Sequence, residues 1–280
     1  MKKLIIYVLL TGVVFFIACG LEDPTKPEIT AINPNQLVLL KTVAIGNSLT
    51  AGVQSAGIVE DFQLNSYPYL IAQQMGQAGN FEQPLLAEPG VGEIDLTTGE
   101  AYGPLKFENG QIVQGDPVPG GALGIPALGK NLFLPRPYDN LGLPGANVDE
   151  IRTATGGGLW DLILRNPNFG NTTALEQAKL LNPTLIFLWA GSNDVLGAAL
   201  DGGDPSKITD PADFLASYSG ILSELSQIRG GQFGLILADI PNVTDIPYVN
   251  LLDSLIYRAI PALGINDPVP VVFDATFQPV

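Results

Sequence analysis

An apolar segment at residues 37–45 leads without interruption into a serine, Ser48, and this junction constrains the fold more than any other feature. Apart from Lys41 and Thr42 the segment is apolar, which is typical of a buried strand. Gly46 and Gly52 lie on either side of the serine. In α/β enzymes such a turn presents a nucleophile at the carboxyl edge of the sheet, so we expect Ser48 to lie there.

The rest of the chain alternates apolar runs with stretches of helical spacing, a pattern typical of a parallel sheet covered by helices. Further strands are expected at 185–190, 233–238 and 271–273, and helices at 66–75, 173–181 and 210–229. We therefore predict an α/β fold, a three-layer α/β/α sandwich around a flavodoxin-like parallel sheet.

The first 18 residues have the pattern of an export signal. Lys2 and Lys3 precede an uncharged stretch at 4–18 that is shorter than the roughly 20 apolar residues that span a bilayer. The segment before Cys19 resembles a bacterial lipobox, which implies a lipidated cysteine that anchors the protein in the cell envelope, at the periplasmic face or the cell surface. The alternative is an ordinary signal peptide with an incidental cysteine. Since Cys19 is the single cysteine, no disulfide within the chain is possible.

These features divide the chain into a signal peptide at 1–18, a proline-containing tether at 19–36 and a domain at 37–280. Within that domain, residues 84–137 are rich in glycine and proline and lack a long period. So long an irregular stretch is either a folded lid or lobe, or a disordered surface insertion. Both alternatives stay open from the sequence.

Charge and composition exclude several classes of function. Thirteen lysines and arginines against 28 acids give a net charge of −15, which argues against binding to nucleic acid. With no histidine and one cysteine, a transition-metal site is not expected, and we predict neither a metal nor a cofactor. Asp201 and Asp204 flank two glycines but lack the ligand spacing of a calcium loop.

Three short segments carry the residue types that acyl transfer needs: 46–50, 140–147 and 190–194. Attack of a serine on an ester builds negative charge on the carbonyl oxygen, and each fixed donor to that oxygen contributes about 3–4 kcal/mol. The backbone N–H groups of Ser48 and Gly145 and the side-chain amide of Asn193 are the candidate donors. Asp194, Trp160 and Trp189 are interpreted as residues of packing and local structure.

The order of these segments resembles the SGNH or GDSL hydrolase family. Asn47 takes the place of the aspartate in the family's Gly-Asp-Ser-Leu block, Gly145 matches the glycine of the second block, and 191–194 match Gly-x-Asn-Asp. The resemblance implies an esterase or lipase that acts on a small-molecule, lipid or glycan ester, with Ser48 as nucleophile. It implies an oxyanion hole made by Ser48, Gly145 and Asn193. Alternatives are a carbohydrate deacetylase or acyltransferase, or a non-catalytic surface lipoprotein that binds lipid or glycan.

One block of the family is missing. The family's Asp-x-x-His motif supplies the general base, whereas Asp274 is followed three residues later by Phe277, and the sequence contains no histidine. We expect that the chain is incomplete at its C-terminus and is inactive as it stands; the alternative is an intact fold without activity. A serine–lysine pair would be another solution. No motif marks any of the candidate lysines, which are Lys41, Lys106, Lys130, Lys179 and Lys207.

Overall fold

The computed structural model describes residues 39–165, 168–201 and 204–242, and every structural statement below concerns these residues. All of them belong to the unit Asn35–Val280. The predicted signal peptide, Cys19, the tether and the predicted strand at 271–273 lie outside the described residues.

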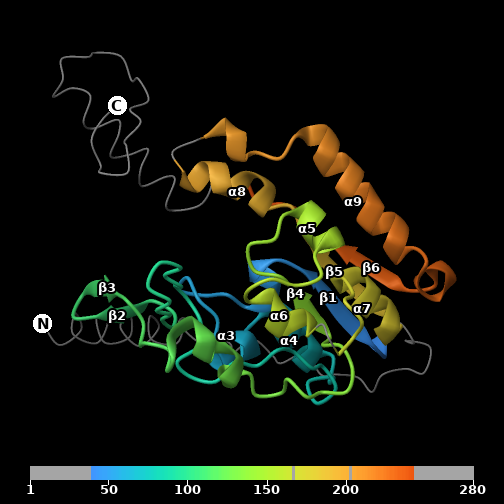
Figure 1. Ribbon diagram of the computed structural model, residues 1–280. Coiled ribbons are helices and arrows are strands. Elements are labelled where there is room, and N and C mark those ends of the chain that lie inside the picture. Colours follow the sequence, from blue (N-terminus) through green and yellow to red (C-terminus); the bar gives the residue numbers. More distant parts are fainter. Residues whose placement is uncertain (1–38, 166–167, 202–203, 243–280) are drawn as a thin grey trace, which may run out of the picture. The chain divides into compact units, whose positions relative to one another are not determined.

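Strands and helices alternate along the described chain (Figure 1). The strands are β1 (Thr42–Gly46), β2 (Lys106–Glu108), β3 (Gln111–Val113), β4 (Asn140–Gly142), β5 (Leu185–Trp189) and β6 (Gly234–Leu237). The α-helices are α2 (Ser48–Ala51), α3 (Glu60–Leu64), α4 (Tyr67–Gln74), α5 (Val148–Thr153), α6 (Trp160–Leu164), α7 (Ala174–Leu181), α8 (Asn193–Leu200) and α9 (Pro211–Leu225). Short 3-10 helices are η2 (Gly121–Leu128), η3 (Pro205–Lys207) and η4 (Ile228–Gly231).

Four of the strands form one sheet in the order β4-β1-β5-β6, and all three pairings are parallel. Gly46, the last residue of β1, is in register with Gly142 of β4 and Trp189 of β5. The three strands therefore end at the same level. The predicted α/β class is confirmed as a parallel sheet flanked by helices.

Successive side chains of a strand point to opposite faces of a sheet, and helices cover both faces here. On one face, Val43 and Ile186 pack in a large core with residues of α5, α7 and α9. On the other face, Ala44 and Phe187 pack against Ala72 of α4. The first four residues of β5 are buried, in agreement with its unbroken apolar sequence.

Local sequence explains where several helices begin. Thr173 and Glu176 form a capping box at the start of α7, and Asn147 and Glu150 form another at the start of α5. Asp210 accepts a hydrogen bond from the backbone N–H of Ala212 at the start of α9. The predicted helix at 210–229 ends earlier, at Leu225, and η4 follows it.

Residues 84–137 are folded, and they contribute to a second hydrophobic core, which they share with two helices. Val91, Val118 and Leu128 pack there together with Ala51 of α2 and Leu162 of α6. The β2–β3 hairpin and η2 belong to this segment. Because its core includes a residue of the helix that begins at Ser48, the segment is packed onto the sheet domain.

One predicted boundary was wrong. Strand β1 begins at Thr42: its register with β5 covers 42–46, and Leu40 is largely exposed, while residues 37 and 38 lie outside the described residues. The second of the three segments begins within the sheet, because its first three residues, Asn140–Gly142, form the buried strand β4.

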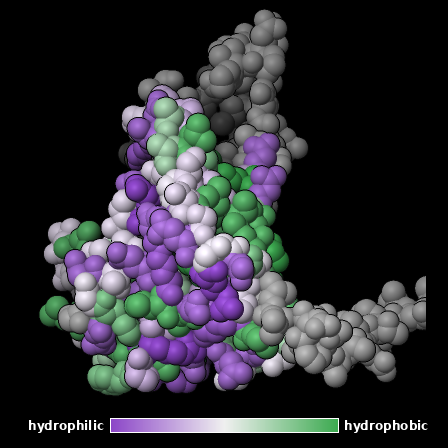
Figure 2. All heavy atoms as spheres, turned by 90° about the vertical axis from the view of Figure 1, so that its right-hand side faces the viewer, coloured by the Kyte–Doolittle hydropathy of each residue, from purple (hydrophilic) through white to green (hydrophobic). Residues whose placement is uncertain are grey.

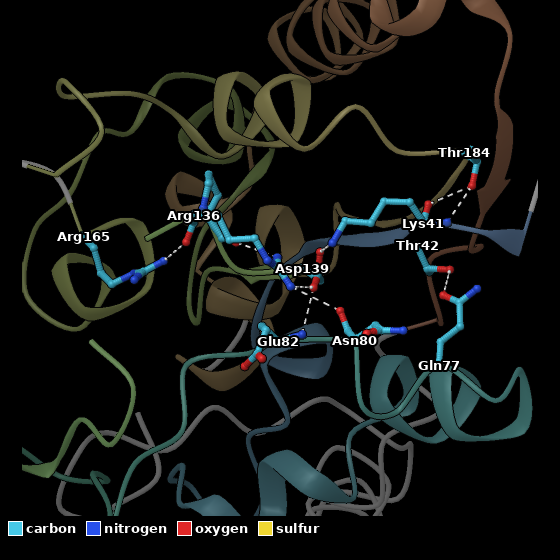
Figure 3. A network of polar contacts seen from close by, with 10 residues as sticks. Lys41, Thr42, Gln77, Asn80, Glu82, Arg136, Asp139, Arg165 and Thr184 are labelled. Atoms are coloured by element: carbon cyan, nitrogen blue, oxygen red, sulfur yellow. Dashed lines mark hydrogen bonds and ion pairs between the residues drawn. The ribbon is translucent and has the colours of Figure 1, made fainter. Parts of the chain in front are cut away.

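A network of polar contacts holds the amino ends of β1 and β4 together (Figure 3). The carboxylate of Asp139, which is fully buried, pairs with Lys41 and with Arg136 and accepts a hydrogen bond from the Glu82 N–H. Thr184, just before β5, accepts from the Lys41 N–H at 2.8 Å and donates to the Lys41 carbonyl at 3.1 Å. Three neighbouring strands are thus linked at this end of the sheet.

Candidate active site

Ser48 is the first residue of α2 and comes two residues after the end of β1. The turn is tight: a Cβ on Gly46 would lie 2.2 Å from the Thr50 hydroxyl and 2.4 Å from the Trp189 carbonyl oxygen. Asn47 caps the helix by accepting from the Leu49 N–H. Within the part of the chain that the structure describes, neither the N–H nor the hydroxyl of Ser48 has a hydrogen-bond partner. Ser48 is half-buried, so its hydroxyl can be reached from solvent.

Gly145 lies in a turn at Leu143–Ala146 that continues from β4. The Ala146 N–H donates to the Leu143 carbonyl at 3.1 Å, Pro144 precedes Gly145, and Gly145 has a φ of +81°. These are the features of a type II turn, which requires a positive φ at its third position and therefore favours glycine. Gly145 is exposed, and a Cβ added to it would meet nothing within 4 Å. Its N–H has no acceptor among the described residues.

Trp160, at the start of α6, sets the direction of that N–H. The indole Nε1–H donates to the Pro144 carbonyl oxygen at 2.9 Å. In a trans peptide the C=O of one residue and the N–H of the next point in opposite directions. With the Pro144 C=O held toward the indole, the Gly145 N–H points away from Trp160.

Asn193, the first residue of α8, joins the third segment to the second. Its Nδ2 donates to the Ala146 carbonyl oxygen at 2.8 Å, which uses one of its two amide hydrogens. Asp194 adds a second link, because its Oδ2 accepts from the Val148 N–H at 3.1 Å. The sequence indicated a role in local structure for Asp194; its carboxylate also reaches the first residue of α5.

The structure brings the three segments together at the carboxyl ends of three adjacent strands. β1 lies between β4 and β5, and Ser48, Gly145 and Asn193 each follow the end of one of them. The Leu143 N–H also donates to the Gly46 carbonyl at 2.8 Å, which ties the second segment to the first. Three residues that are 48 to 145 positions apart in sequence therefore meet at one edge of the sheet.

Several buried polar atoms in or next to these segments lack a partner among the described residues. They are Asn47 Nδ2, Trp189 Nε1 and Ser192 Oγ. Buried polar groups are nearly always paired in folded proteins, and exceptions concentrate at functional sites. Burial also raises the pKa of Asp194, an effect that its hydrogen bonds partly oppose.

Tyr67 and Trp189 form an aromatic pair on the α4 side of the same edge. Their rings meet edge to face, with centroids 5.3 Å apart, and the Tyr67 hydroxyl lies 3.1 Å from the Thr50 hydroxyl. Burial raises the pKa of Tyr67, and the Thr50 contact opposes the shift. Tyr67 is therefore neutral near pH 7 and contributes an apolar ring and one hydroxyl.

The structure shows where each lysine considered as a base lies. All five are in ion pairs, namely Lys41–Asp139, Lys106–Asp116, Lys130–Glu60, Lys179–Glu224 and Lys207–Asp201. Lys41 also precedes β1, whereas Ser48 follows it, so the two residues lie at opposite ends of that strand. None of these five lysines is thus available as a free amine beside Ser48.

No group of three or more potential metal ligands occurs among the described side chains. Asp204 caps η3 by accepting from the Ser206 N–H, while residues 202 and 203 lie outside the described ranges. Over residues 39–165, 168–201 and 204–242, none of the helices has the length and apolarity needed to span a bilayer.

Two features of the site escaped the sequence analysis. The bond from Trp160 to Pro144 joins residues in different segments and has no local signal. The turn at Leu143–Ala146 did have a local signal, because a Pro-Gly dipeptide is typical of a type II turn.

Comparison of the chain with protein-family models, curated proteins and solved structures gave no match.

Proposed function

We propose that this chain is a serine ester hydrolase of the esterase or lipase type, which acts through an acyl-enzyme on Ser48. One observation carries the proposal: at one edge of the sheet, two backbone N–H groups lack an acceptor and the Asn193 amide has a hydrogen to spare. They belong to Ser48, Gly145 and Asn193. Since Gly145 is exposed and Ser48 is half-buried, these donors are open to an incoming oxyanion, which fixed donors stabilise.

The chemistry follows from these groups. The Ser48 Oγ attacks the carbonyl carbon of an ester, and the three donors bind the negative oxygen that forms. The bond to the alcohol then breaks, and the alcohol leaves with the proton that the serine hydroxyl gave up. Water attacks the acyl group on Ser48 and releases the acid. The donors lie on two helix starts and a type II turn, so little reorganisation accompanies the change in charge.

The resemblance to the SGNH or GDSL hydrolases supports the same proposal. The strand order β4-β1-β5-β6, with β1 first in the chain, is compatible with a flavodoxin-like sheet. A carbohydrate deacetylase or an acyltransferase would use the same donors and the same nucleophile. These reactions differ in the alcohol or in the acceptor of the acyl group.

A second function is favoured by the absence of histidine from the sequence. In that case the protein is a non-catalytic lipoprotein that binds a lipid or glycan at the same edge of the sheet. Without a base, the Ser48 hydroxyl stays protonated and is a poor nucleophile. The residual rate enhancement from oxyanion donors alone is on the order of 10³–10⁴ over water in serine proteases that lack their triad.

Labelling with a fluorophosphonate tests these proposals. We expect weak labelling of the 280-residue chain, at Ser48, and none in Ser48→Ala. Ser192→Ala is a matched control, because Ser192 lies near the same edge but is not the proposed nucleophile. Labelling at another residue would contradict the role of Ser48. Strong labelling at Ser48 would show that a base other than histidine serves it.

We also propose that Cys19 is lipidated and that it anchors the domain to the bacterial cell envelope. Mass spectrometry of the membrane fraction should then find a diacylglyceryl group on Cys19 at the mature N-terminus. Cys19→Ser should abolish the modification and release the protein from the membrane. A mature N-terminus at another residue would contradict this proposal.

A further inference from the structure

Asn140 is a polar residue at a buried position of the sheet. Polar side chains normally lie at the surface, as the hydrophilic side chains on the side of the molecule that carries α9 do (Figure 2). Asn140 is instead the first residue of β4, a strand that is buried throughout, and it is only 1% exposed. A buried amide costs free energy unless it is hydrogen-bonded, so its partners indicate what it contributes.

Both ends of the Asn140 amide are hydrogen-bonded. The Nδ2 donates to the Thr50 carbonyl oxygen at 2.8 Å and to Gln83 Oε1 at 3.2 Å. The Oδ1 accepts from the Gly142 N–H at 3.1 Å. Gln83 is buried and is held in turn, since its Nε2 donates to the Gln63 carbonyl at 2.9 Å. The Asn140 amide is therefore fixed in one orientation, with its N–H groups toward Thr50 and Gln83.

The bond to Thr50 acts on the helix that begins at Ser48. This helix, α2, has four residues, which is too few for a helix to be stable by itself. It lies directly on the backbone of β4, because a Cβ added to Gly142 would be 2.4 Å from the Ala51 nitrogen and 2.8 Å from the Thr50 carbonyl carbon. The position of α2 thus depends on its contacts with neighbouring elements, and Asn140 ties it to β4.

We propose that Asn140 is a positioning residue that sets Ser48 in place relative to Gly145. The inference rests on the proposed function, in which the N–H groups of Ser48 and Gly145 bind the same oxygen. Asn140 belongs to the strand that leads into the turn of Gly145, and its side chain holds the helix that carries Ser48. A misplacement of about 1 Å can lower a reaction rate by as much as 10²-fold, so this tie affects the reaction although Asn140 touches no reacting group.

Hydrogen exchange tests whether Asn140 holds α2, without reference to catalysis. The Ala51 and Gly52 amides are bonded to carbonyl groups of the turn at α2, at 3.0 and 3.1 Å, so their exchange reports the opening of this helix. In Asn140→Ala we expect both amides to exchange faster by about tenfold or more. Asn131→Ala is the matched control, because Asn131 also uses both ends of its amide but bonds to residues outside α2. It should leave the two amides unchanged.

The kinetics of labelling by a fluorophosphonate test the effect on the reaction. In Asn140→Ala, the maximal rate of labelling at Ser48 should fall by about tenfold or more, because α2 is displaced. The probe concentration that gives half of this rate should stay unchanged, because Asn140 does not touch the probe. Asn131→Ala should label at the wild-type rate. A general loss of stability would instead affect the two variants alike.

Asn140→Leu keeps the volume of the side chain and removes its hydrogen bonds, so it replaces Asn140→Ala in both measurements if the smaller side chain prevents folding. Unchanged exchange of the Ala51 and Gly52 amides would overturn the proposal. A labelling rate equal to that of Asn131→Ala would also overturn it. Wild-type protein that is not labelled at Ser48 would contradict the proposed function, whereas faster exchange in the Asn140 variants would still show that this residue holds α2.

Discussion

At the amino ends of β1 and β4, the charged groups of Lys41, Arg136 and Asp139 are paired with one another, whereas at the carboxyl ends of the same strands polar groups lack partners. The two ends are only a few residues apart along each strand. One end carries a fully buried carboxylate with three partners. The other carries the unpaired N–H groups of Ser48 and Gly145.

The amino end of this sheet therefore contributes to stability, whereas the carboxyl end holds the groups that we propose for ester hydrolysis. A buried ionic group is tolerated only when it is fully paired, so the amino end has a single arrangement that joins three strands. At the carboxyl end, the donors without protein partners are available to an incoming charge. Substitutions at the two ends should therefore have different consequences: loss of stability at one, loss of ester chemistry at the other.

The largest effect is expected at the amino end. Asp139→Ala leaves Lys41 and Arg136 without their shared partner and the Glu82 N–H without an acceptor, so unfolding should become easier by about 3 kcal/mol. Denaturant unfolding measures the change. Asp116→Ala is the control, because it breaks the exposed Lys106 pair and should cost less than about 1 kcal/mol. Equal effects of the two variants would show that the network at the amino end stabilises the fold no more than an exposed ion pair does.

Asn193→Ala should show the reverse pattern. It removes a donor that we assign to the oxyanion hole, so any residual hydrolysis of an activated short-chain ester should fall by about 10²-fold or more. Loss of the bond to the Ala146 carbonyl should cost only about 1 kcal/mol of stability. A variant that loses stability but keeps the residual rate would show that Asn193 serves the fold alone.

Trp160→Phe tests the orientation of the Gly145 peptide. The ring stays in the core, but the bond to the Pro144 carbonyl is lost, at about 1 kcal/mol of stability. We expect the Gly145 amide signal in an NMR spectrum to shift and broaden as the turn gains freedom. Leu162→Ala, which alters packing on the same helix, should leave that signal in place. An unchanged Gly145 signal in Trp160→Phe would mean that the turn keeps its conformation without the hydrogen bond from the indole.

The smallest effect concerns Asp194 and pH. Burial raises its pKa in the folded state, so the folded protein takes up this proton at a higher pH than the unfolded chain does. The stability that protonation contributes is present at acidic pH and is lost as pH rises through the folded-state pKa. Relative to Asp194→Asn, the wild-type protein should gain stability as the pH falls from 7 toward 4. Chemical denaturation of both proteins across this range measures the difference, and a constant difference would contradict it.

Some of the architecture was predictable because it depends on neighbours in sequence. The capping pair of Thr173 and Glu176 predicted the start of α7, and the unbroken apolar run at 185–190 predicted the buried strand β5. The glycine-flanked turn after 37–45 likewise placed Ser48 at a strand end. The start of β1 was predicted less well, because pairing partners and not hydrophobicity decide where a strand begins.

By itself, the sequence determined the α/β class, the order of the three polar segments and the absence of any histidine. These are properties of composition and of short spacings. Only the tertiary structure decided that β1 lies between β4 and β5, that Trp160 orients the Gly145 peptide, and that each of the five lysines considered is paired. Many of these contacts join residues far apart in the chain. They depend on how the strands pair and pack, which no local pattern of residues specifies.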